Sequence, residues 1–382
     1  MIAHPTPPVI TDATELAAAI PRLAASGRLA IDTEAASFHR YADRVFLVQV
    51  SSDRETVLVD PLHAGDLQPI GAVLADAAVE SVFHDADYDL RILDRDYGFR
   101  ATRLFDTRIA AQLLGEPGIG LSALLEKYFG VRLDKKLQRA DWSARPLSPE
   151  MVAYAAADTR HLLGLRDELA RRLEAAGRLS WAQEEFTRLE ETRWSPPDRE
   201  AAHLQLTGAR ALSPRGKVVL RALWEWRDTT ARALDRPAFR VAPNEALVAI
   251  ARAAPSAAGA LYRVEGLPRT IGRRYEADLL AAVQDGLHRD IVRVERTKPS
   301  GGRPDPTIEA RMNRLKDLRN RRATELGIEP GVLCPNGALL AVARAAPQNS
   351  QDVANVPELR KWQREGLTDE AILQAVGTDD AQ

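Results

Sequence analysis

The chain carries the run RLAIDTE at residues 28–34, a short apolar segment that ends in two carboxylates. Its alternation predicts a strand, because successive side chains of a strand point to opposite faces. Asp32 and Glu34 then lie about 6.6 Å apart on one face, while Thr33 points to the other. Two carboxylates in this arrangement are close enough to reach a shared pair of metal ions.

The sequence around this run predicts an α/β domain. Short apolar segments separated by turn-like residues indicate strands, and longer runs of mixed polarity between and after them indicate helices. This mixture is typical of a domain with a central mixed sheet. The expected strands are RLAIDTE, RVFLVQVSS (44–52), ETVLVDPL (55–62) and VESVFH (79–84), and the expected helices are 67–77, 85–98, 105–115, 121–130 and 148–177.

Further acids occur in two later segments. Asp85, Asp87 and Asp89 lie around the start of the helix after VESVFH, where any of them could act as a cap or favour the positive helix end. Tyr154 and Asp158 are four residues apart and therefore share a helix face. The alanines between them allow that face to pack closely against a sheet. A buried aspartate at that position needs a partner or a metal ion.

Bulk properties limit the protein class. The chain has 382 residues, one cysteine (Cys334) and a net charge of −2, so two or three domains without a disulfide framework are expected. No apolar run is long enough to span a membrane, and residues 1–10 lack the features of a signal peptide. A cytoplasmic protein is therefore expected. Residues 1–200 carry 24 basic and 32 acidic side chains and residues 201–382 carry 28 and 22, which suits an enzyme acting on a polyanion.

The C-terminal half contains an internal repeat. Residues 226–255 align without gaps on residues 318–347, with 13 of 30 positions identical, and such similarity indicates a duplicated unit. Trp194-Ser195-Pro196-Pro197 resembles a linker before the first copy, and the basic Gly/Pro-rich segment RTKPSGGRPDPT separates the two. We therefore expect two small helical domains after the α/β domain, with boundaries at 1–200, 208–290 and 308–377.

If the fold brings Asp32, Glu34, Asp89 and Asp158 together, they form a set of hard oxygen ligands. Such ligands suit Mg²⁺ or Mn²⁺ rather than zinc. Divalent ions held in this way support the hydrolysis of phosphodiesters. The acids therefore favour a nuclease.

The three segments together resemble the DEDD exonucleases of ribonuclease H-like fold, in the subgroup with tyrosine in the third motif. IDTE matches the first motif, FHDADYDL the second and YAAAD the third. KKLQRADWSARPLS (135–148) and the tandem repeats, which resemble HRDC domains, extend the likeness to the ribonuclease D family. In the second motif the metal ligand precedes leucine, which implies Asp89; Asp85 and Asp87 beside it are a departure from the family pattern.

The resemblance implies a 3′–5′ exoribonuclease that uses two divalent ions, releases nucleoside monophosphates and processes transfer-RNA precursors. Asp32 would bridge the ions, Glu34 and Asp158 would complete the first site, and Asp89 would hold the second. A tyrosine has a pKa near 10 and is a poor base at neutral pH. Tyr154 is therefore expected to orient the attacking water.

Substrate contacts follow less directly. We expect Thr33, His84 and Arg145 to touch the substrate, with a structural role as the alternative for His84. The basic run of Lys135, Lys136, Arg139 and Arg145 either steers the phosphate backbone or forms a solvated surface face. Trp142 either stacks on a base or packs the domain. The helical modules are expected to add affinity, with RMNRLKDLRNRR (311–322) either following phosphates or forming a solvated helix face.

Two other functions remain open from the sequence. The same carboxylates occur in DNA exonucleases, and the sugar contacts that separate RNA from DNA cannot be located. A catalytically silent nucleic-acid-binding scaffold is disfavoured because all five motif positions are present.

Overall fold

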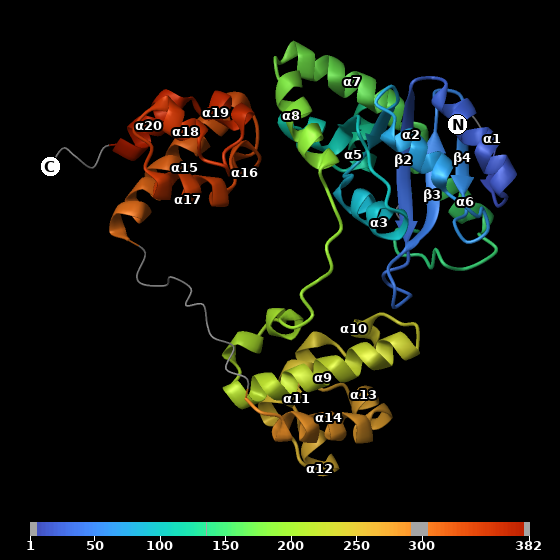
Figure 1. Ribbon diagram of the computed structural model, residues 1–382, viewed down its shortest axis with the longest axis vertical. Helices are drawn as coiled ribbons and strands as arrows, with labels where there is room; N and C mark the ends of the chain where they lie inside the picture. Colours follow the sequence, from blue (N-terminus) through green and yellow to red (C-terminus); the bar gives the residue numbers. More distant parts are fainter. Residues whose placement is uncertain (1–5, 135, 292–304, 378–382) are drawn as a thin grey trace.

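The computed structural model describes residues 6–134, 136–291 and 305–377, which form three parts (Figure 1). The α/β domain holds six strands and the first eight helices. The first helical unit contains α9–α14, and the second helical unit contains α15–α20. The expected α/β domain with a mixed sheet, followed by two helical modules, is confirmed.

The six strands form one mixed sheet with the order β1-β4-β3-β2-β5-β6. Neighbours pair in parallel except at β4–β3 and β3–β2, which are antiparallel. The strand that carries RLAIDTE, β2, therefore lies inside the sheet, between β3 and β5. The strand bounds are β1 (Val9–Ile10), β2 (Arg28–Ala35), β3 (Val45–Ser51), β4 (Thr56–Val59), β5 (Glu80–Phe83) and β6 (Leu104–Asp106).

Helices cover both faces of this sheet. Helix α6 packs on β2, β3 and β4 over a small core that includes Phe46, Leu58 and Trp142. The other helices share a larger core with the opposite face, which includes Leu29 and Ile31. The helix bounds are α1 (Ala13–Ala24), α2 (Gln68–Ala75), α3 (Asp87–Tyr97), α4 (Thr107–Leu113), α5 (Leu121–Phe129), α6 (Pro149–Arg160), α7 (Leu162–Ala175) and α8 (Leu179–Glu190).

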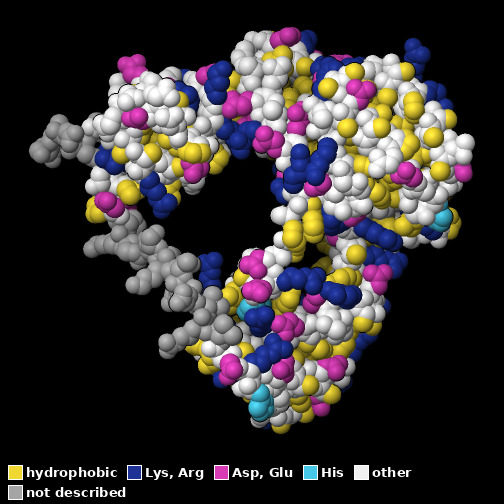
Figure 2. Space-filling model, viewed as in Figure 1, with side chains coloured by type: hydrophobic (Ala, Val, Ile, Leu, Met, Phe, Trp, Pro, Cys, Tyr) yellow, Lys and Arg dark blue, Asp and Glu magenta, His cyan; other side chains and the backbone are white. Residues whose placement is uncertain are grey.

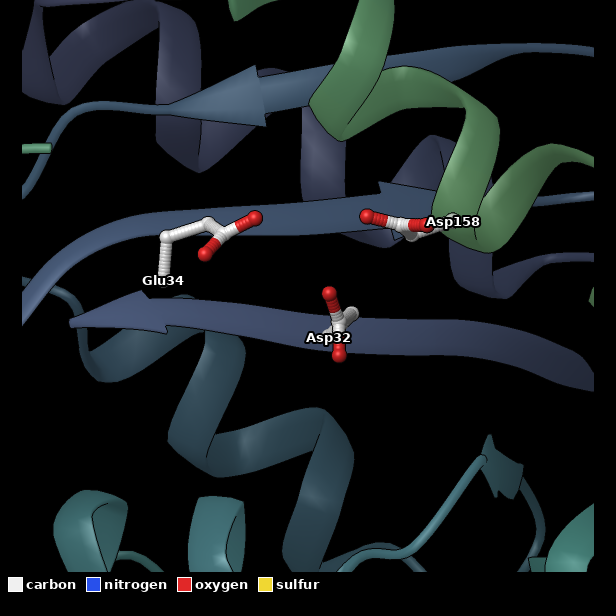
Figure 3. Close-up of side chains that lie close together, drawn as sticks. All are labelled: Asp32, Glu34 and Asp158. Atoms are coloured by element: carbon white, nitrogen blue, oxygen red, sulfur yellow. The ribbon is translucent and has the colours of Figure 1, made fainter. Parts of the chain in front are cut away.

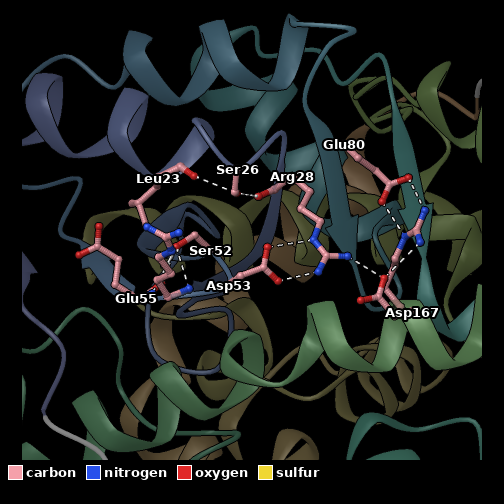
Figure 4. Close-up of polar contacts among 10 residues, drawn as sticks. Leu23, Ser26, Arg28, Ser52, Asp53, Glu55, Glu80 and Asp167 are labelled. Atoms are coloured by element: carbon pink, nitrogen blue, oxygen red, sulfur yellow. Dashed lines mark hydrogen bonds and ion pairs between the residues drawn. The ribbon is translucent and has the colours of Figure 1, made fainter.

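The beginning of β2 is held by ion pairs (Figure 4). The guanidinium of Arg28 donates to both carboxylate oxygens of Asp53, at 3.0 and 2.6 Å, and to Asp167 at 2.6 Å. Beside it, Arg166 donates to both oxygens of Glu80 at 2.7 and 2.9 Å. These contacts join β2 to β5 and to α7, and so fix the strand at the end away from its carboxylates.

The structure corrects the expected single helix over 148–177. The helix ends at Arg160, and a new one begins at Leu162 after His161, whose φ and ψ are −103° and 0°. The break follows from packing, because α6 lies on β2–β4 while α7 contacts α4, α5 and β5. Strands β1 and β6 have two and three residues, and they were not expected from the sequence.

The two helical units confirm the internal repeat. Arg227 in the first donates to the carbonyl of Ala242, and the equivalent Arg319 in the second donates to the carbonyl of Cys334. Each arginine also donates to the side-chain oxygen of the asparagine two residues after that carbonyl, Asn244 in the first unit and Asn336 in the second, at 2.8 and 2.9 Å. The helix bounds are α9 (Pro214–Ala233), α10 (Ala238–Val241), α11 (Asn244–Ala253), α12 (Ala258–Leu261), α13 (Arg269–Arg274), α14 (Glu276–His288), α15 (Pro306–Leu326), α16 (Pro330–Leu333), α17 (Asn336–Ala345), α18 (Ser350–Ala354), α19 (Lys361–Leu367) and α20 (Asp369–Gly377).

The two units join the α/β domain differently. The second shares one continuous hydrophobic core with it, in which Trp181 of α8 packs on Trp362 of α19 with ring centroids 5.4 Å apart. The first unit has a separate core of its own. Short 3₁₀ turns, Ala202–Gln205 and Ala209–Ala211, lead into it from the exposed segment after α8. Within the described residues, no helix is long and apolar enough to cross a membrane.

Candidate active site

The first two carboxylates lie where β2 runs beside β3. Asp32 pairs with Gln49 and Glu34 with Leu47 in the antiparallel register, and the register shifts after Glu34. Regular pairing up to this point keeps both side chains on the face that α6 covers. The irregularity that follows ends the pairing and lets the chain turn away from the sheet.

Helix α6 supplies the third motif. The Ser148 hydroxyl accepts the N–H of Met151 at 3.2 Å, and Pro149 occupies the first turn, so the helix begins at a fixed point. Ala155 and Ala156 are completely buried against the sheet. Their small side chains bring the helix close to β2 and direct Asp158 towards the carboxylates of that strand.

These elements bring three carboxylates together (Figure 3). One oxygen from each of Asp32, Glu34 and Asp158 lies within 4.8 Å of the other two. In the described part of the chain, none of the three forms an ion pair with lysine or arginine. A group of half-buried carboxylates without a positive partner is costly. Its oxygen donors and negative charge therefore fit a divalent cation.

Asp89 lies beside this group but is not one of the three. It stands in the first turn of α3 and is 6% exposed. Its Oδ1 accepts a hydrogen bond from the hydroxyl of Thr33, the residue between the two acids of β2. Asp89 is thus fixed to β2 through Thr33, near enough to Asp32 for the charges of the two carboxylates to interact.

Asp85 and Asp87 point elsewhere. Asp85 pairs with Arg108, and Asp87 pairs with Arg91 at 2.8 Å, in both cases with carboxylates that are more than half exposed. Asp85 also adopts a positive φ of 70°, which belongs to the turn between β5 and α3. The arrangement therefore agrees with the choice of Asp89 and gives the other two acids a role at the surface.

The electrostatics of the group reflect burial and crowding. Burial raises the pKa of Asp32 to about 7, against the lowering effect of the Thr33 backbone. Burial and the charge of Asp32 raise the pKa of Asp158 to about 8. The pKa values of Glu34 and Asp89 are raised by burial and then by Asp32. A cation placed among these groups would favour their ionised forms and reverse this effect.

Tyr154 reaches the same place one turn before Asp158. Burial raises the pKa of its hydroxyl, and the negative charges of Asp158, Glu34 and Asp32 raise it further. The hydroxyl therefore remains protonated at neutral pH and is a hydrogen-bond donor. Trp142, 1% exposed, packs against its ring at a centroid distance of 6.0 Å, so Trp142 belongs to the core rather than to a base-stacking surface.

Two of the expected substrate contacts have internal partners. The Nδ1 of His84 lies 2.9 Å from the Thr107 hydroxyl, and burial followed by the charge of Arg108 lowers the pKa of His84 to about 4. His84 is therefore neutral, and its Nδ1 is engaged with α4. The Thr33 hydroxyl is likewise engaged, because it donates to Asp89.

The expectation for Arg145 is not supported. All five of its N–H groups have acceptors, namely both carboxylate oxygens of Asp60 and the carbonyls of Phe46, Trp142 and Ala144, at 2.7 to 2.8 Å. Asp60 is 2% exposed, so the pair is buried. Arg145 thus fixes the segment before α6, and no donor is left for a phosphate.

Three arginines of the basic run 311–322 neither follow phosphates nor form part of a solvated helix face. Arg314 donates to the carbonyl of Ala375, Arg319 to that of Cys334 and Arg322 to that of Gly366, at 2.7 to 3.1 Å. These guanidinium groups therefore bind helix ends of the second helical unit. In the run before α6, Lys136 pairs with Asp134 at 3.1 Å, and Lys135 lies outside the described residues.

Sequence reasoning missed Asp106, which supports the second motif. It is 1% exposed at the end of β6, and its carboxylate accepts the N–H groups of Asp85, Ala86, Arg108 and Ile109 at 2.8 to 3.3 Å. Asp106 therefore caps α4 and holds the turn that begins α3, which carries Asp89. Its place directly before a helix was the available signal.

Comparison with known proteins shows the family of the chain. Residues 7–174 match the model of a 3′–5′ exonuclease family, and residues 217–283 and 308–376 each match that of the HRDC domain. The chain is 32% identical over 374 residues to ribonuclease D of Granulibacter bethesdensis, covering 96% of this chain and 92% of the relative. It is 33% identical over 377 residues to ribonuclease D of Gluconacetobacter diazotrophicus, with the same coverages.

Solved structures extend the similarity to the whole fold. RNase D of Escherichia coli, described as an exoribonuclease involved in structured RNA processing, matches with a TM-score of 0.72 and 28% identity, covering 96% of this chain and 98% of that one. A protein from Bifidobacterium adolescentis matches with a TM-score of 0.83 and 26% identity, covering 97% of both chains. The catalytic core of RRP6 from Trypanosoma brucei matches with a TM-score of 0.64 and 28% identity, covering 75% of this chain and 84% of that one.

Proposed function

The chain belongs to the ribonuclease D family and is a 3′–5′ exoribonuclease, and from this premise we propose that it trims the 3′ ends of transfer-RNA precursors with two divalent ions, Mg²⁺ or Mn²⁺. The observation that carries the proposal is the convergence of Asp32, Glu34 and Asp158 within 4.8 Å, with Asp89 beside them. The proposal places the protein in the cytoplasm. Its single cysteine, Cys334, is free and buried, which fits a reducing compartment.

In this proposal the carboxylates divide between two ions. Asp32, Glu34 and Asp158 would hold the first ion, because their oxygens already lie close together. Asp89, with Asp32, would hold the second. Divalent ions bound there would neutralise charge on the phosphate and acidify water. The protein's part is to hold both ions on rigid elements, β2, α3 and α6.

The other residues of the site position the reacting groups. The Tyr154 hydroxyl is a donor next to Asp158 and Glu34, and it orients the attacking water towards phosphorus. The ring of Trp142 and the buried Ala155 and Ala156 keep Tyr154 and its helix in place. Thr33 holds Asp89 through its hydroxyl. None of these residues needs to change its charge during the reaction.

The experiment is the digestion of a transfer RNA with a 3′ extension. Enzyme stripped of metal is incubated with EDTA, Mg²⁺ or Mn²⁺, and the products are separated by size. Nucleoside 5′-monophosphates that accumulate from the 3′ end only with a divalent ion would support the proposal. Internal fragments, or digestion that proceeds in EDTA, would contradict it. Single-stranded DNA of the same sequence, digested in parallel, tests the preference for RNA.

A further inference from the structure

The two helical units present the same short segment to the α/β domain, with different chemistry. At an offset of 92, the first unit's Arg236, Phe239 and Arg240 correspond to Ile328, Gly331 and Val332 of the second. In the second unit this segment packs tightly on the α/β domain. The backbones of Gly115 and Gly327 are so close that a Cβ atom added to Gly115 would lie 1.7 Å from the carbonyl oxygen of Gly327. Ile328, the next residue, is buried. In the first unit, Arg236, Phe239 and Arg240 are all exposed.

The first unit is held next to the loop that leaves the metal-binding strand. Tyr41 donates through its hydroxyl to Asp228 at 2.8 Å and through its backbone N–H to Asp235 at 3.2 Å. Arg40 pairs with Asp235 at 3.0 Å, and the guanidinium of Arg232 lies over the Tyr41 ring. Figure 1 shows α10 on the side of this unit that faces the α/β domain.

Two exposed aromatic rings meet across this junction. Phe38 from the loop and Phe239 from α10 are 41% and 50% exposed, with ring centroids 6.2 Å apart and planes at 71°. A large apolar side chain buried at an interface would not leave so much of its ring open. Aromatic faces left accessible beside cationic groups are the usual means of binding single-stranded nucleic acid without sequence preference.

The cations of the junction are of two kinds. Arg40 and Arg232 neutralise the acids Asp228 and Asp235. By contrast, the guanidinium groups of Arg139, Arg236 and Arg240 form no hydrogen bond or ion pair with any residue that the structure describes, and Arg139 lies 5.2 Å from the Phe38 ring. Figure 2 shows lysine and arginine side chains on both sides of the junction, with hydrophobic ones between them.

The junction is close to the site of hydrolysis. Phe38 follows Glu34 by four residues, so their Cα atoms are at most roughly 14 Å apart even in an extended chain. A strand of RNA that leaves the carboxylate site along this loop would reach the junction within its last few nucleotides. Its phosphates would meet free guanidinium groups and its bases would meet the two rings.

We propose that Phe239 and Arg240 of the first helical unit, together with Phe38 and Arg139 of the α/β domain, form a binding surface for the single-stranded 3′ segment of the RNA. Phe239 stacks on a base and Arg240 pairs with a phosphate. The second helical unit lacks an aromatic ring and a guanidinium group at these positions, and it stays packed on the α/β domain. This inference rests on the proposed function, since it assumes an RNA substrate with a free 3′ tail.

The test measures binding of a single-stranded RNA to the full chain, with Ca²⁺ in place of the catalytic ions and intact RNA verified on a gel. Phe239→Ala is expected to weaken binding by about 5- to 150-fold, with an unchanged slope of log K against log salt. Arg240→Ala is expected to reduce that slope by about 0.7, as for one lost phosphate contact on a single strand. Tyr262→Ala is the matched control, because Tyr262 is 46% exposed in the same unit, next to α12 at its far end.

A second measurement separates stacking from a purely structural role of the ring. Phe239→Trp should retain RNA binding and Phe239→Leu should lose it, since leucine keeps the apolar contact but has no aromatic face. RNA with 5-iodouridine in its last positions should cross-link within residues 36–41 or 236–241. Binding unaltered in Phe239→Leu, or cross-links found only outside those segments, would overturn the inference.

These outcomes are distinct from those of the proposed function. If the junction binds RNA but the transfer-RNA extension is not trimmed, the proposed function fails and the binding surface stands. If Phe239→Ala and Arg240→Ala bind and digest RNA as the unaltered protein does, the surface is wrong while the proposed function stands.

Discussion

The hydroxyl of Thr33 donates a hydrogen bond to Asp89, and this contact joins the first carboxylate motif to the second. Thr33 stands between Asp32 and Glu34 but on the opposite face of β2, so one strand positions carboxylates on both of its sides. The residue that separates the two acids therefore has a function of its own: it fixes the acid that comes from α3.

Thr33→Val should weaken binding of the second ion. Valine keeps the volume of threonine but cannot donate to Asp89, and loss of a partner that orients a metal ligand typically costs 10- to 100-fold in affinity or activity. We expect the Mn²⁺ concentration for half-maximal activity to rise by roughly that factor. Thr33→Ser, which retains the hydroxyl, is the control and should stay near the original value. An unchanged metal dependence in Thr33→Val would show that the hydrogen bond has no such role.

Tyr154→Phe should reduce the rate of hydrolysis without changing metal binding. The hydroxyl is protonated at neutral pH and touches no ion in the proposed arrangement, so its loss removes the orientation of water only. A decrease in kcat of about 10²-fold or more is expected, the size of an acid–base contribution. Titration of Mn²⁺ by calorimetry should give the same affinity as for the unaltered protein. A variant that no longer binds metal would contradict this role.

The metal-free protein should become less stable as pH rises from about 4 to 8. Carboxyl groups with raised pKa values bind more protons in the folded than in the unfolded state over this interval, so the free energy of unfolding falls with pH. The interval follows from the pKa values of about 7 and 8 for Asp32 and Asp158. Thermal melting in EDTA at pH 5 and pH 8 measures the effect.

Two comparisons accompany that measurement. Asp158→Asn should show a smaller fall in melting temperature, because one ionisable member of the group is gone. Mn²⁺ at pH 8 should raise the melting temperature of the unaltered protein, since the ion stabilises the ionised carboxylates. Equal melting curves at both pH values in EDTA would contradict the raised pKa values of Asp32 and Asp158.

Arg145→Met should destabilise the fold and leave RNA binding intact. The substitution removes five hydrogen bonds and leaves Asp60 buried with only His63 near its charge. Removing one partner of a buried ion pair costs roughly 3 kcal/mol or more. Arg139→Met is the matched control with the opposite outcome: an unchanged melting temperature and weaker RNA binding. If Arg145→Met instead melts normally and loses RNA, Arg145 is a substrate contact after all.

The parts of the fold that the sequence predicts well are those with strong local patterns. The alternation in RLAIDTE gave β2 and the shared face of Asp32 and Glu34, and Ser148-Pro149 gave the start of α6. The gapless repeat over 226–255 and 318–347 predicted two related helical units, which the matching bonds of Arg227 and Arg319 confirm.

Features that depend on distant contacts were not visible in the sequence. The break at His161 contains neither proline nor glycine. It arises because α6 packs mainly on β3 and β4, whereas α7 packs mainly on α4. Arg145 and the arginines of α15 read as surface charges, yet they bind a buried acid and helix-end carbonyls that come from remote positions. Positive charge in a sequence does not reveal whether its acceptor is a phosphate or a carbonyl of the same chain.

The central claim is that carboxylates from three separate segments hold the ions that hydrolyse RNA, and Asp32→Asn tests it most directly. The rate of mononucleotide release from a 3′-extended transfer RNA is measured across a range of Mn²⁺ concentrations, with Asp85→Asn as the control. Asp85 has an exposed carboxylate paired with Arg108, and asparagine tolerates its positive φ. We predict no release by Asp32→Asn at any Mn²⁺ concentration and normal release by Asp85→Asn; substantial turnover by Asp32→Asn would contradict the account.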